Sequence, residues 1–164
     1  MILPEHAVFL LVEDRDDDIQ LVRRALARAK VFNPFFFVRS GDEALDYLNG
    51  VGKFRNRAEY PLPHIMLLDL KMPRMDGFEV LRFVRSRPEF KALIIIVLTS
   101  SEDLKDVNKA YDLGANSFLV KPLEFDNYAA VMHTLSSFWL RYSLAPDLSR
   151  ESASGRKTIP PASG

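Results

Sequence analysis

Short apolar runs alternate with segments of helical periodicity along most of the chain. Five runs are predicted to be strands: residues 7–12, 35–38, 65–68, 93–98 and 118–120. The segments between and after them have apolar residues spaced as on one face of a helix, which predicts helices near residues 16–29, 44–48, 78–84, 104–113 and 125–142. Because the strand runs are apolar at successive positions, this alternation predicts a buried parallel sheet with helices on both faces.

The number and order of these elements predict one α/β domain. Five successive β/α units favour a flavodoxin-like (βα)5 fold, a doubly wound parallel sheet with strand order 2-1-3-4-5. Ser40 followed by Glu43 predicts a capping box, Ser101 an N-cap, and Gly114 the end of a helix. Residues 49–64 contain two Gly and two Pro and are expected to form a long loop. We assign residues 5–142 to the domain and residues 143–164, rich in Ser, Pro and Gly, to a disordered tail.

The composition excludes several classes of protein. The chain has 164 residues, of which 48% are hydrophobic, enough for one domain with its own core. Lys and Arg together number 22, as do Asp and Glu, so no basic field exists to bind nucleic acid or an anionic membrane. The absence of Cys excludes disulfides, and no apolar run reaches the roughly 18 residues of a membrane span. We therefore expect a cytoplasmic protein with no nucleic-acid or membrane partner.

Acidic side chains follow two of the predicted strands. Glu13 and Asp14 come after the first strand, and Asp69 comes after the third. In a doubly wound sheet ligands bind at the carboxyl ends of the strands, where the strand order reverses, here between the first and third strands. Three crowded carboxylates repel one another unless a cation lies among them, and oxygen ligands without Cys or His favour Mg²⁺. Residues 16–18 are also acidic, but they match the dipole of a helix start and are left out of this site.

A hydroxyl and an ammonium group follow two further strands. Thr99 ends the fourth predicted strand, and Lys121 follows the fifth, with Pro122 next. Phosphoryl transfer depends mainly on charge neutralisation and positioning. A carboxylate, a magnesium ion, a hydroxyl and an ammonium group at one sheet edge therefore suit a phosphoryl group.

Four motifs give the chain its resemblance to a known family. They are "LLVED" at residues 10–14, "LLDLKMPRMDG" at 67–77, "VLTSS" at 97–101 and "FLVKP" at 118–122. In this order and at these strand ends they resemble the response regulator receiver domain, the CheY-like module of two-component signalling. The resemblance covers about residues 5–142, and the combination of four motifs is more specific than any one of them.

The resemblance implies a role for each acidic residue. Asp69 would be the phosphoacceptor, attacking a phosphohistidine and holding the phosphoryl group as an acyl phosphate. Glu13, Asp14 and Asp69 would hold Mg²⁺ together with the backbone carbonyl of Lys71. Since that fourth contact is made by the main chain, the side chain of Lys71 is free to vary.

The resemblance also implies which residues bind the phosphoryl group and how the protein responds to it. Thr99 would hydrogen-bond the phosphoryl oxygens, and Lys121 would pair with them as a point charge. Phe118 occupies the family's aromatic switch position, so that Thr99 and Phe118 together would change the surface of the fourth helix, fifth strand and last helix. A purely structural role for Phe118, as a core residue, stays open. The bond from Lys121 to Pro122 would be cis, as in the family.

These roles define a signalling protein and its rivals. A sensor histidine kinase would phosphorylate Asp69, and the altered surface would engage a downstream protein or a histidine phosphotransfer protein. Only a short tail follows residue 142, so we expect a single-domain regulator that is no enzyme beyond phosphorylating and dephosphorylating itself. A phosphatase of the haloacid dehalogenase type would need a second acid two residues after the nucleophile, where this chain has Lys71. A pseudo-receiver that binds proteins without taking phosphate is disfavoured, because the site residues are all retained.

The last predicted helix carries more apolar surface than one core contact needs. Phe138, Trp139 and Leu140 are consecutive and span a wider arc than the usual apolar face. The loop at residues 49–64, the tail or a second subunit could cover this surface. With that long loop, the chain resembles stand-alone receivers associated with phytochrome-type sensor kinases, and we hypothesise a homodimer. His133, in the same helix, is interpreted as a surface or packing residue.

Overall fold

Five parallel strands form one sheet with the order β2-β1-β3-β4-β5, which confirms the predicted fold class. The computed structural model describes residues 4–142, and the predicted disordered tail lies outside them. The strands are β1 (Phe9–Val12), β2 (Phe35–Val38), β3 (Ile65–Leu68), β4 (Ile94–Thr99) and β5 (Ser117–Val120). The helices are α1 (Asp16–Arg28), α2 (Gly41–Asn49), α3 (Gly77–Ser86), α4 (Leu104–Asp112) and α5 (Phe125–Ser137), and a π-helical segment continues α5 over Phe138–Tyr142. No helix in this part of the chain is long and apolar enough to cross a membrane.

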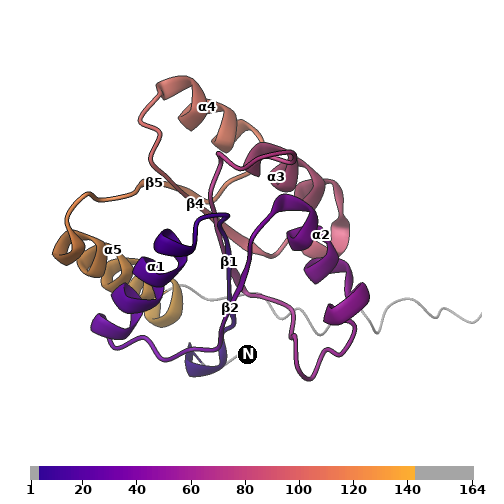
Figure 1. Cartoon of the computed structure of the whole chain (residues 1–164), viewed down its shortest axis with the longest axis horizontal. Coiled ribbons are helices and arrows are strands. Elements are labelled where there is room, and N and C mark those ends of the chain that lie inside the picture. The colour runs from indigo at the N-terminus through magenta and orange to yellow at the C-terminus, as the bar shows by residue number, and fades with distance from the viewer. Residues whose placement is uncertain (1–3, 143–164) are drawn as a thin grey trace, which may run out of the picture.

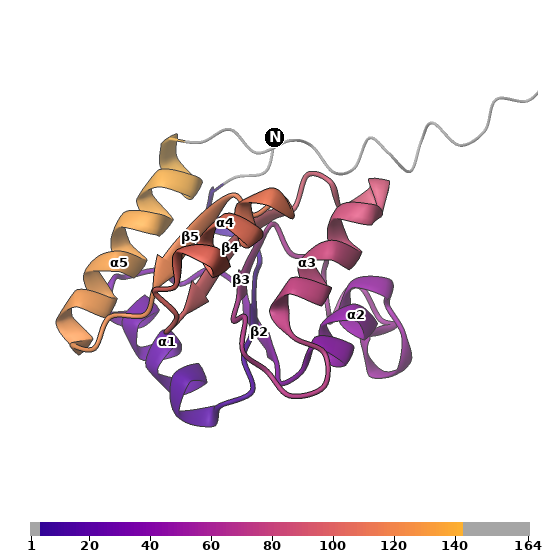
Figure 2. The same cartoon turned by 90° about the horizontal axis from the view of Figure 1, so that it is seen from above.

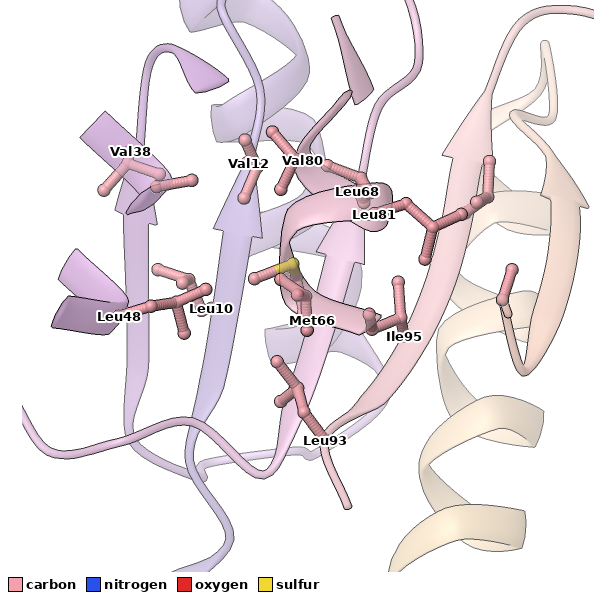
Figure 3. Close-up of a cluster of buried hydrophobic side chains, with 14 of the residues drawn as sticks. Leu10, Val12, Val38, Leu48, Met66, Leu68, Val80, Leu81, Leu93 and Ile95 are labelled. Carbon is pink, nitrogen blue, oxygen red and sulfur yellow. The ribbon is translucent and has the colours of Figure 1, made fainter. Parts of the chain in front are cut away.

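Helices cover both faces of the sheet. α1 and α5 lie side by side on one face, and α2 and α3 lie on the other (Figures 1 and 2). Successive residues of a strand point to opposite faces, so Leu10 packs in the cluster under α2 and α3 while Leu11 packs in the cluster under α1 and α5. The first of these clusters joins alternate residues of β1, β3 and β4 to α3 (Figure 3). This two-sided burial explains why the strands have continuous apolar sequences.

The predicted N-cap of α2 is confirmed, but the capping box is incomplete. Glu43 N donates to Ser40 Oγ over 3.1 Å. The carboxylate of Glu43 accepts from the backbone N–H of Arg39 over 2.8 Å, one residue before the cap. Glu43 thus binds the backbone one residue before the N-cap instead of the N–H of the N-cap itself. A complete capping box occurs instead at the start of α3, between Asp76 and Glu79.

The N-cap of α4 differs from the prediction. Asp103, two residues after Ser101, is the N-cap, and its side chain accepts from Lys105 N over 2.9 Å. The Ser101 hydroxyl instead donates to the Asp106 carboxylate over 2.6 Å. Aspartate is as good an N-cap as serine, so residue type alone does not distinguish the two positions. Gly114 follows the end of α4 with a φ of +99°, as predicted for a helix terminator.

The loop before β3 packs on α2 rather than on α5. Phe54, within a short 3-10 turn, packs against Tyr47 of α2 with tilted rings whose centroids are 4.9 Å apart. The Arg57 guanidinium donates to the carbonyl oxygens of Tyr47 and Leu48 over 2.7 and 2.6 Å, which satisfies the carboxyl end of α2. Since Phe54 belongs to the cluster under α2 and α3, this loop is not the cover for the apolar surface of α5.

Candidate functional site

Three carboxylates meet at the carboxyl ends of the two central strands β1 and β3, as predicted. Glu13, Asp14 and Asp69 each offer one oxygen, and these oxygens lie within 4.8 Å of one another. Glu13 is 1% exposed and Asp69 is 6% exposed. The β1–β3 pairing aligns Val12 with Leu68, which fixes the acidic residues that follow them side by side. Burial at this depth is costly for a carboxylate without a compensating charge.

Lys121 supplies the compensating charge in this structure. Its Nζ donates to Glu13 Oε2 over 2.5 Å and to Asp18 Oδ2 over 3.2 Å, and lies 3.7 Å from Asp69 Oδ2. The backbone N–H of Lys121 donates to the Thr99 carbonyl over 2.8 Å, so the β4–β5 pairing places the lysine over the acidic cluster. The bond to Pro122 is trans, which corrects the cis isomer implied by the resemblance. Trans is the lower-energy isomer even before proline.

The electrostatics of the cluster are dominated by burial. Burial raises the pKa of Glu13 from 4.5 to about 7, against the opposing effect of the hydrogen bond from Lys121, and the neighbouring Asp69 charge adds to the rise. Burial alone would lower the pKa of Lys121, but the hydrogen bond to Glu13 and the charges of Asp69 and Asp18 raise it overall. The lysine therefore stays an ammonium, while Glu13 is held in a site that favours its neutral form unless more positive charge arrives.

Two polar atoms at this edge are buried without a hydrogen-bond partner among the described residues: Asp14 Oδ1 and Thr99 Oγ1. Native structures rarely leave such atoms unpaired, and each unpaired atom calls for an explanation. The carboxylate oxygen is a suitable ligand atom for a hard divalent cation, and the hydroxyl a suitable donor to an anion. The oxygen-only donor set of Glu13, Asp14 and Asp69 thus fits Mg²⁺ or a similar metal.

A cavity of about 450 Å³ opens over the cluster and is lined by Asp69, Lys71, Ser100 and Lys121, among others. The side chain of Lys71 is exposed, in keeping with a role for its backbone alone. Gly77 lets the β3–α3 loop fold back here, since its N–H donates to Leu70 O over 2.9 Å and a Cβ at this position would lie 2.2 Å from Asp69 O. That the carbonyl of Lys71 is a metal ligand stays a prediction.

Phe118 lies half-buried on β5 and packs against the cluster under α2 and α3. Its backbone N–H donates to the hydroxyl of Tyr111, on α4, over 3.1 Å. The contact links α4 to the strand that carries the predicted switch residue. Partial burial agrees with either a core role or a switch role, so the switch assignment stays a prediction.

Two residues of the site were missed in the sequence. Asp18 was interpreted as part of a solvated helix start, yet it pairs with Lys121; Asp16 on the same turn pairs instead with Arg39 on the surface. Asp14 precedes α1 and Asp18 lies in its first turn, so no helical spacing links the two, and the sequence offered no signal that separates Asp18 from its acidic neighbours. The fully buried hydroxyl of Tyr128 lines the same cavity without a hydrogen-bond partner among the described residues. In the sequence, the aromatic ring of Tyr128 fits the apolar face of the last helix, so the pattern indicates a core residue and not a residue of the site.

Comparison with known proteins gives a consistent set of relatives. Residues 9–133 match the model of the response regulator receiver domain. Response regulator Rcp1 of Synechocystis is 33% identical over 139 residues, covering 85% of this chain and 92% of the relative. The probable methanogenesis regulatory protein FilR2 of Methanothrix harundinacea is also 33% identical, covering 85% of this chain and 87% of that protein.

Solved structures agree with these relatives. The phosphorylated cyanobacterial phytochrome response regulator RcpA superposes with a TM-score of 0.80 at 34% identity, covering 87% of this chain and 99% of that chain. The Mn²⁺-bound form of Rcp1 superposes with a TM-score of 0.77 at 32% identity, covering 86% of this chain and 99% of that chain. These similarities extend over the whole sheet and its helices.

Proposed function

The chain belongs to the response regulator receiver family, and from this premise we propose that it accepts a phosphoryl group from a sensor histidine kinase onto Asp69. The family match spans residues 9–133. The observation that carries the proposal is the convergence of three carboxylate oxygens within 4.8 Å of one another, with the Lys121 ammonium 3.7 Å from Asp69. Glu13 shares this burial and this cluster, and the resemblance of the "LLDLKMPRMDG" motif to the family assigns the phosphoacceptor role to Asp69.

The proposed reaction uses Asp69 as the nucleophile. A carboxylate oxygen of Asp69 attacks the phosphorus of a phosphohistidine, the O–P bond forms as the N–P bond breaks, and the imidazole leaves with the electron pair. Lys121 turns from Glu13 toward the new phosphoryl oxygens, and the unpaired Thr99 hydroxyl donates to them.

We propose that Mg²⁺ is the resident metal. Glu13, Asp14, Asp69 and the Lys71 carbonyl would hold it, and when bound it supplies charge neutralisation at the phosphoryl oxygens. Rcp1 has been solved in a Mn²⁺-bound form, and the two ions share a preference for oxygen ligands.

Receiver-domain response regulators are generally signalling proteins rather than enzymes with turnover. We propose that the only chemistry here is the phosphorylation and the self-catalysed dephosphorylation of Asp69. A phosphatase of the haloacid dehalogenase type remains disfavoured, because Lys71 stands where such an enzyme has its second acid. A pseudo-receiver is disfavoured by the convergence of the site residues Glu13, Asp14 and Asp69.

The output surface is proposed to lie on α4, β5 and α5. Exposed large apolar side chains are concentrated there: Leu104 and Tyr111 on α4, Val120 on β5 and Phe138 after α5. Solvent-exposed apolar residues gathered on one side are typical of partner surfaces. Movement of Thr99 and Phe118 on phosphorylation would change how β5 and α4 present these side chains.

The partners follow from this role. The similarity to a cyanobacterial phytochrome response regulator supports a phytochrome-type histidine kinase as the phosphoryl donor. The receiver unit is proposed to comprise residues 5–142 and to act in the cytoplasm. Downstream it would engage a protein partner or a histidine phosphotransfer protein.

We also propose a homodimer through α5 and the segment after it. An apolar cavity of about 370 Å³ lies between β5 and α5 and is lined by Leu119, Leu135, Phe138 and Trp139, among others. Phe138 is 54% exposed, and the loop before β3 packs elsewhere. A second copy of this chain would bury this surface on both subunits at once, as a two-fold interface does.

Acetyl phosphate labelling tests the phosphoacceptor. The chain is incubated with acetyl phosphate and Mg²⁺, and intact mass is expected to show one added phosphoryl group. Asp69→Asn and addition of EDTA should each abolish the label, whereas Asp112→Asn, an exposed carboxylate on α4, should retain it. Label that persists in the Asp69 variant or in EDTA contradicts the site assignment.

Light scattering tests the homodimer. The mass should rise with concentration toward that of a dimer, and Phe138→Ser should shift it toward the monomer. Val51→Ser, a matched control at a comparably exposed apolar residue in the loop after α2, should not. A monomer mass at every concentration, with and without phosphorylation, would remove the homodimer.

A further inference from the structure

A second polar cavity lies at the opposite edge of the sheet from Asp69. Its volume is about 330 Å³, and its lining includes Glu5, Lys30, His133, Ser136 and Arg141. Glu5 precedes β1 and Lys30 precedes β2, so both stand at the amino ends of parallel strands. The other three come from α5 and the π-helical segment that follows it. The cavity is therefore separate from the phosphorylation site, which lies at the carboxyl ends.

Ser136 presents an unusual hydroxyl to this cavity. The residue is 4% exposed, and its Oγ is buried without a hydrogen-bond partner among the described residues. A serine within a helix can usually satisfy its hydroxyl on the carbonyl one turn earlier. An unpaired buried hydroxyl that lines a polar cavity is instead a donor available to a ligand.

Lys30 lines the same cavity from a strained backbone conformation. Its φ is +58°, in the left-handed region. It stands just after the C-cap of α1, where its N–H donates to Ala27 O and the next N–H, of Val31, donates to Leu26 O. This pair of bonds is a Schellman motif, in which the left-handed position is usually glycine. Lysine is less favourable than glycine in this backbone conformation. Residues with a strained backbone are often found at functional sites.

The charges around the cavity favour an anion. Neither Lys30 nor Arg141 forms an ion pair with another described residue, although both line the cavity. Glu5 is the one carboxylate of the lining, and His133 is exposed at its rim. Two unpaired cations against one carboxylate leave a net positive charge beside the Ser136 hydroxyl.

We propose that this cavity binds a small anion, a phosphate or carboxylate group, held by Lys30, Arg141 and the hydroxyl of Ser136. Charged hydrogen bonds of this kind are the strong ones in anion recognition. The competing explanation is that the two cations only complement the carboxyl ends of α1 and α5. A lysine one residue earlier would complement the carboxyl end of α1 equally well, without a left-handed backbone conformation. The competing explanation also gives no role to the unpaired Ser136 hydroxyl.

The strained lysine provides a sharp test. Lys30→Gly removes the cation and places the preferred residue at the left-handed position, so the fold should be retained with an equal or higher melting temperature. Ser136→Ala removes a buried unpaired hydroxyl and should also preserve the fold. Both variants should weaken anion binding, by roughly tenfold or more for the lysine.

The measurement is a ¹⁵N-correlation NMR titration of the full chain in EDTA with sodium phosphate, sodium malonate and, for ionic strength, sodium chloride. We expect saturable shifts at residues 30–33 and 133–141 with phosphate or malonate, weakened in both variants, and none with chloride. Shifts confined to the amides around Asp69 would report on the other site and count against this one. No saturable shift with either anion, or equal affinity in Lys30→Gly and the unmodified chain, would overturn the proposal.

Discussion

Replacing Glu13 with glutamine should stabilise the metal-free protein increasingly as the pH rises. Burial raises the pKa of Glu13 from 4.5 to about 7, so the folded state favours the neutral carboxyl. A folded pKa above the unfolded value gives stability that is fully present below 4.5 and is lost as the pH rises through about 7. Glutamine keeps the shape of the side chain but never ionises, so the variant escapes this loss.

The size of the effect follows from the same two pKa values. Each unit of difference between the unfolded and folded pKa values corresponds to about 1.4 kcal/mol. Ionising Glu13 in the folded protein therefore costs at most roughly 3 kcal/mol. The variant also weakens a charge-assisted hydrogen bond from Lys121, which costs about 1 kcal/mol. Lys121 keeps Asp18 and Asp69 as neighbours. We therefore expect a net gain of about 1–2 kcal/mol near pH 8, a few degrees in melting temperature.

Urea unfolding in EDTA at several pH values, about 5 to 8, measures this difference. His64 acts in the opposite direction, because its Nδ1 accepts from Val8 N and burial lowers its pKa, so its stability is lost on acidification. Because both proteins contain His64, its contribution cancels when their free energies of unfolding are subtracted. Mg²⁺ should stabilise the unmodified protein at the upper pH more than the variant, which lacks one carboxylate ligand and its negative charge. A free-energy difference that is independent of pH, or a variant less stable near pH 8, would refute the reasoning.

Three further changes test other parts of the structure. Gly77→Ala brings a Cβ to 2.2 Å from the backbone carbonyl of Asp69, so thermal unfolding should show a loss of about 1–3 kcal/mol, with slower labelling by acetyl phosphate. Arg57→Ala removes the guanidinium from the end of α2 and should cost about 2 kcal/mol in urea unfolding without changing that labelling. Tyr111→Phe frees the N–H of Phe118; hydrogen exchange at residue 118 should accelerate, with about 1 kcal/mol of stability lost. An unchanged exchange rate would contradict the link between α4 and β5.

Sequence patterns predicted those parts of the fold in which burial alone decides the structure. β2 and β3 have the predicted bounds, residues 35–38 and 65–68, because an apolar run between polar turns leaves little freedom at either end. The helix caps were less predictable, since both Ser101 and Asp103 carry a suitable oxygen. Only the path of the chain into α4 decides that Asp103 is the N-cap.

The parts of the candidate site that depend on strand order could be predicted from the sequence. The contacts that long side chains make across the site could not. Glu13, Asp14 and Asp69 follow strands that pair in the sheet, so their meeting follows from the strand order. Asp18 meets Lys121 across more than a hundred residues of sequence, and no local pattern distinguishes it from Asp16. The packing of Phe54 on Tyr47 likewise required the tertiary path of the loop.

Calorimetric titration of the full chain with Mg²⁺ tests the central claim most directly, namely that the carboxylates at the ends of β1 and β3 form one divalent-metal site around the phosphoacceptor. The account predicts saturable binding of one ion per chain, with affinity that rises with pH as Glu13 ionises. Asp14→Asn should weaken it strongly, whereas Asp16→Asn, an exposed acid beside the site, should leave it unchanged. Binding that is absent from the unmodified chain, or that survives unaltered in Asp14→Asn, would contradict the account.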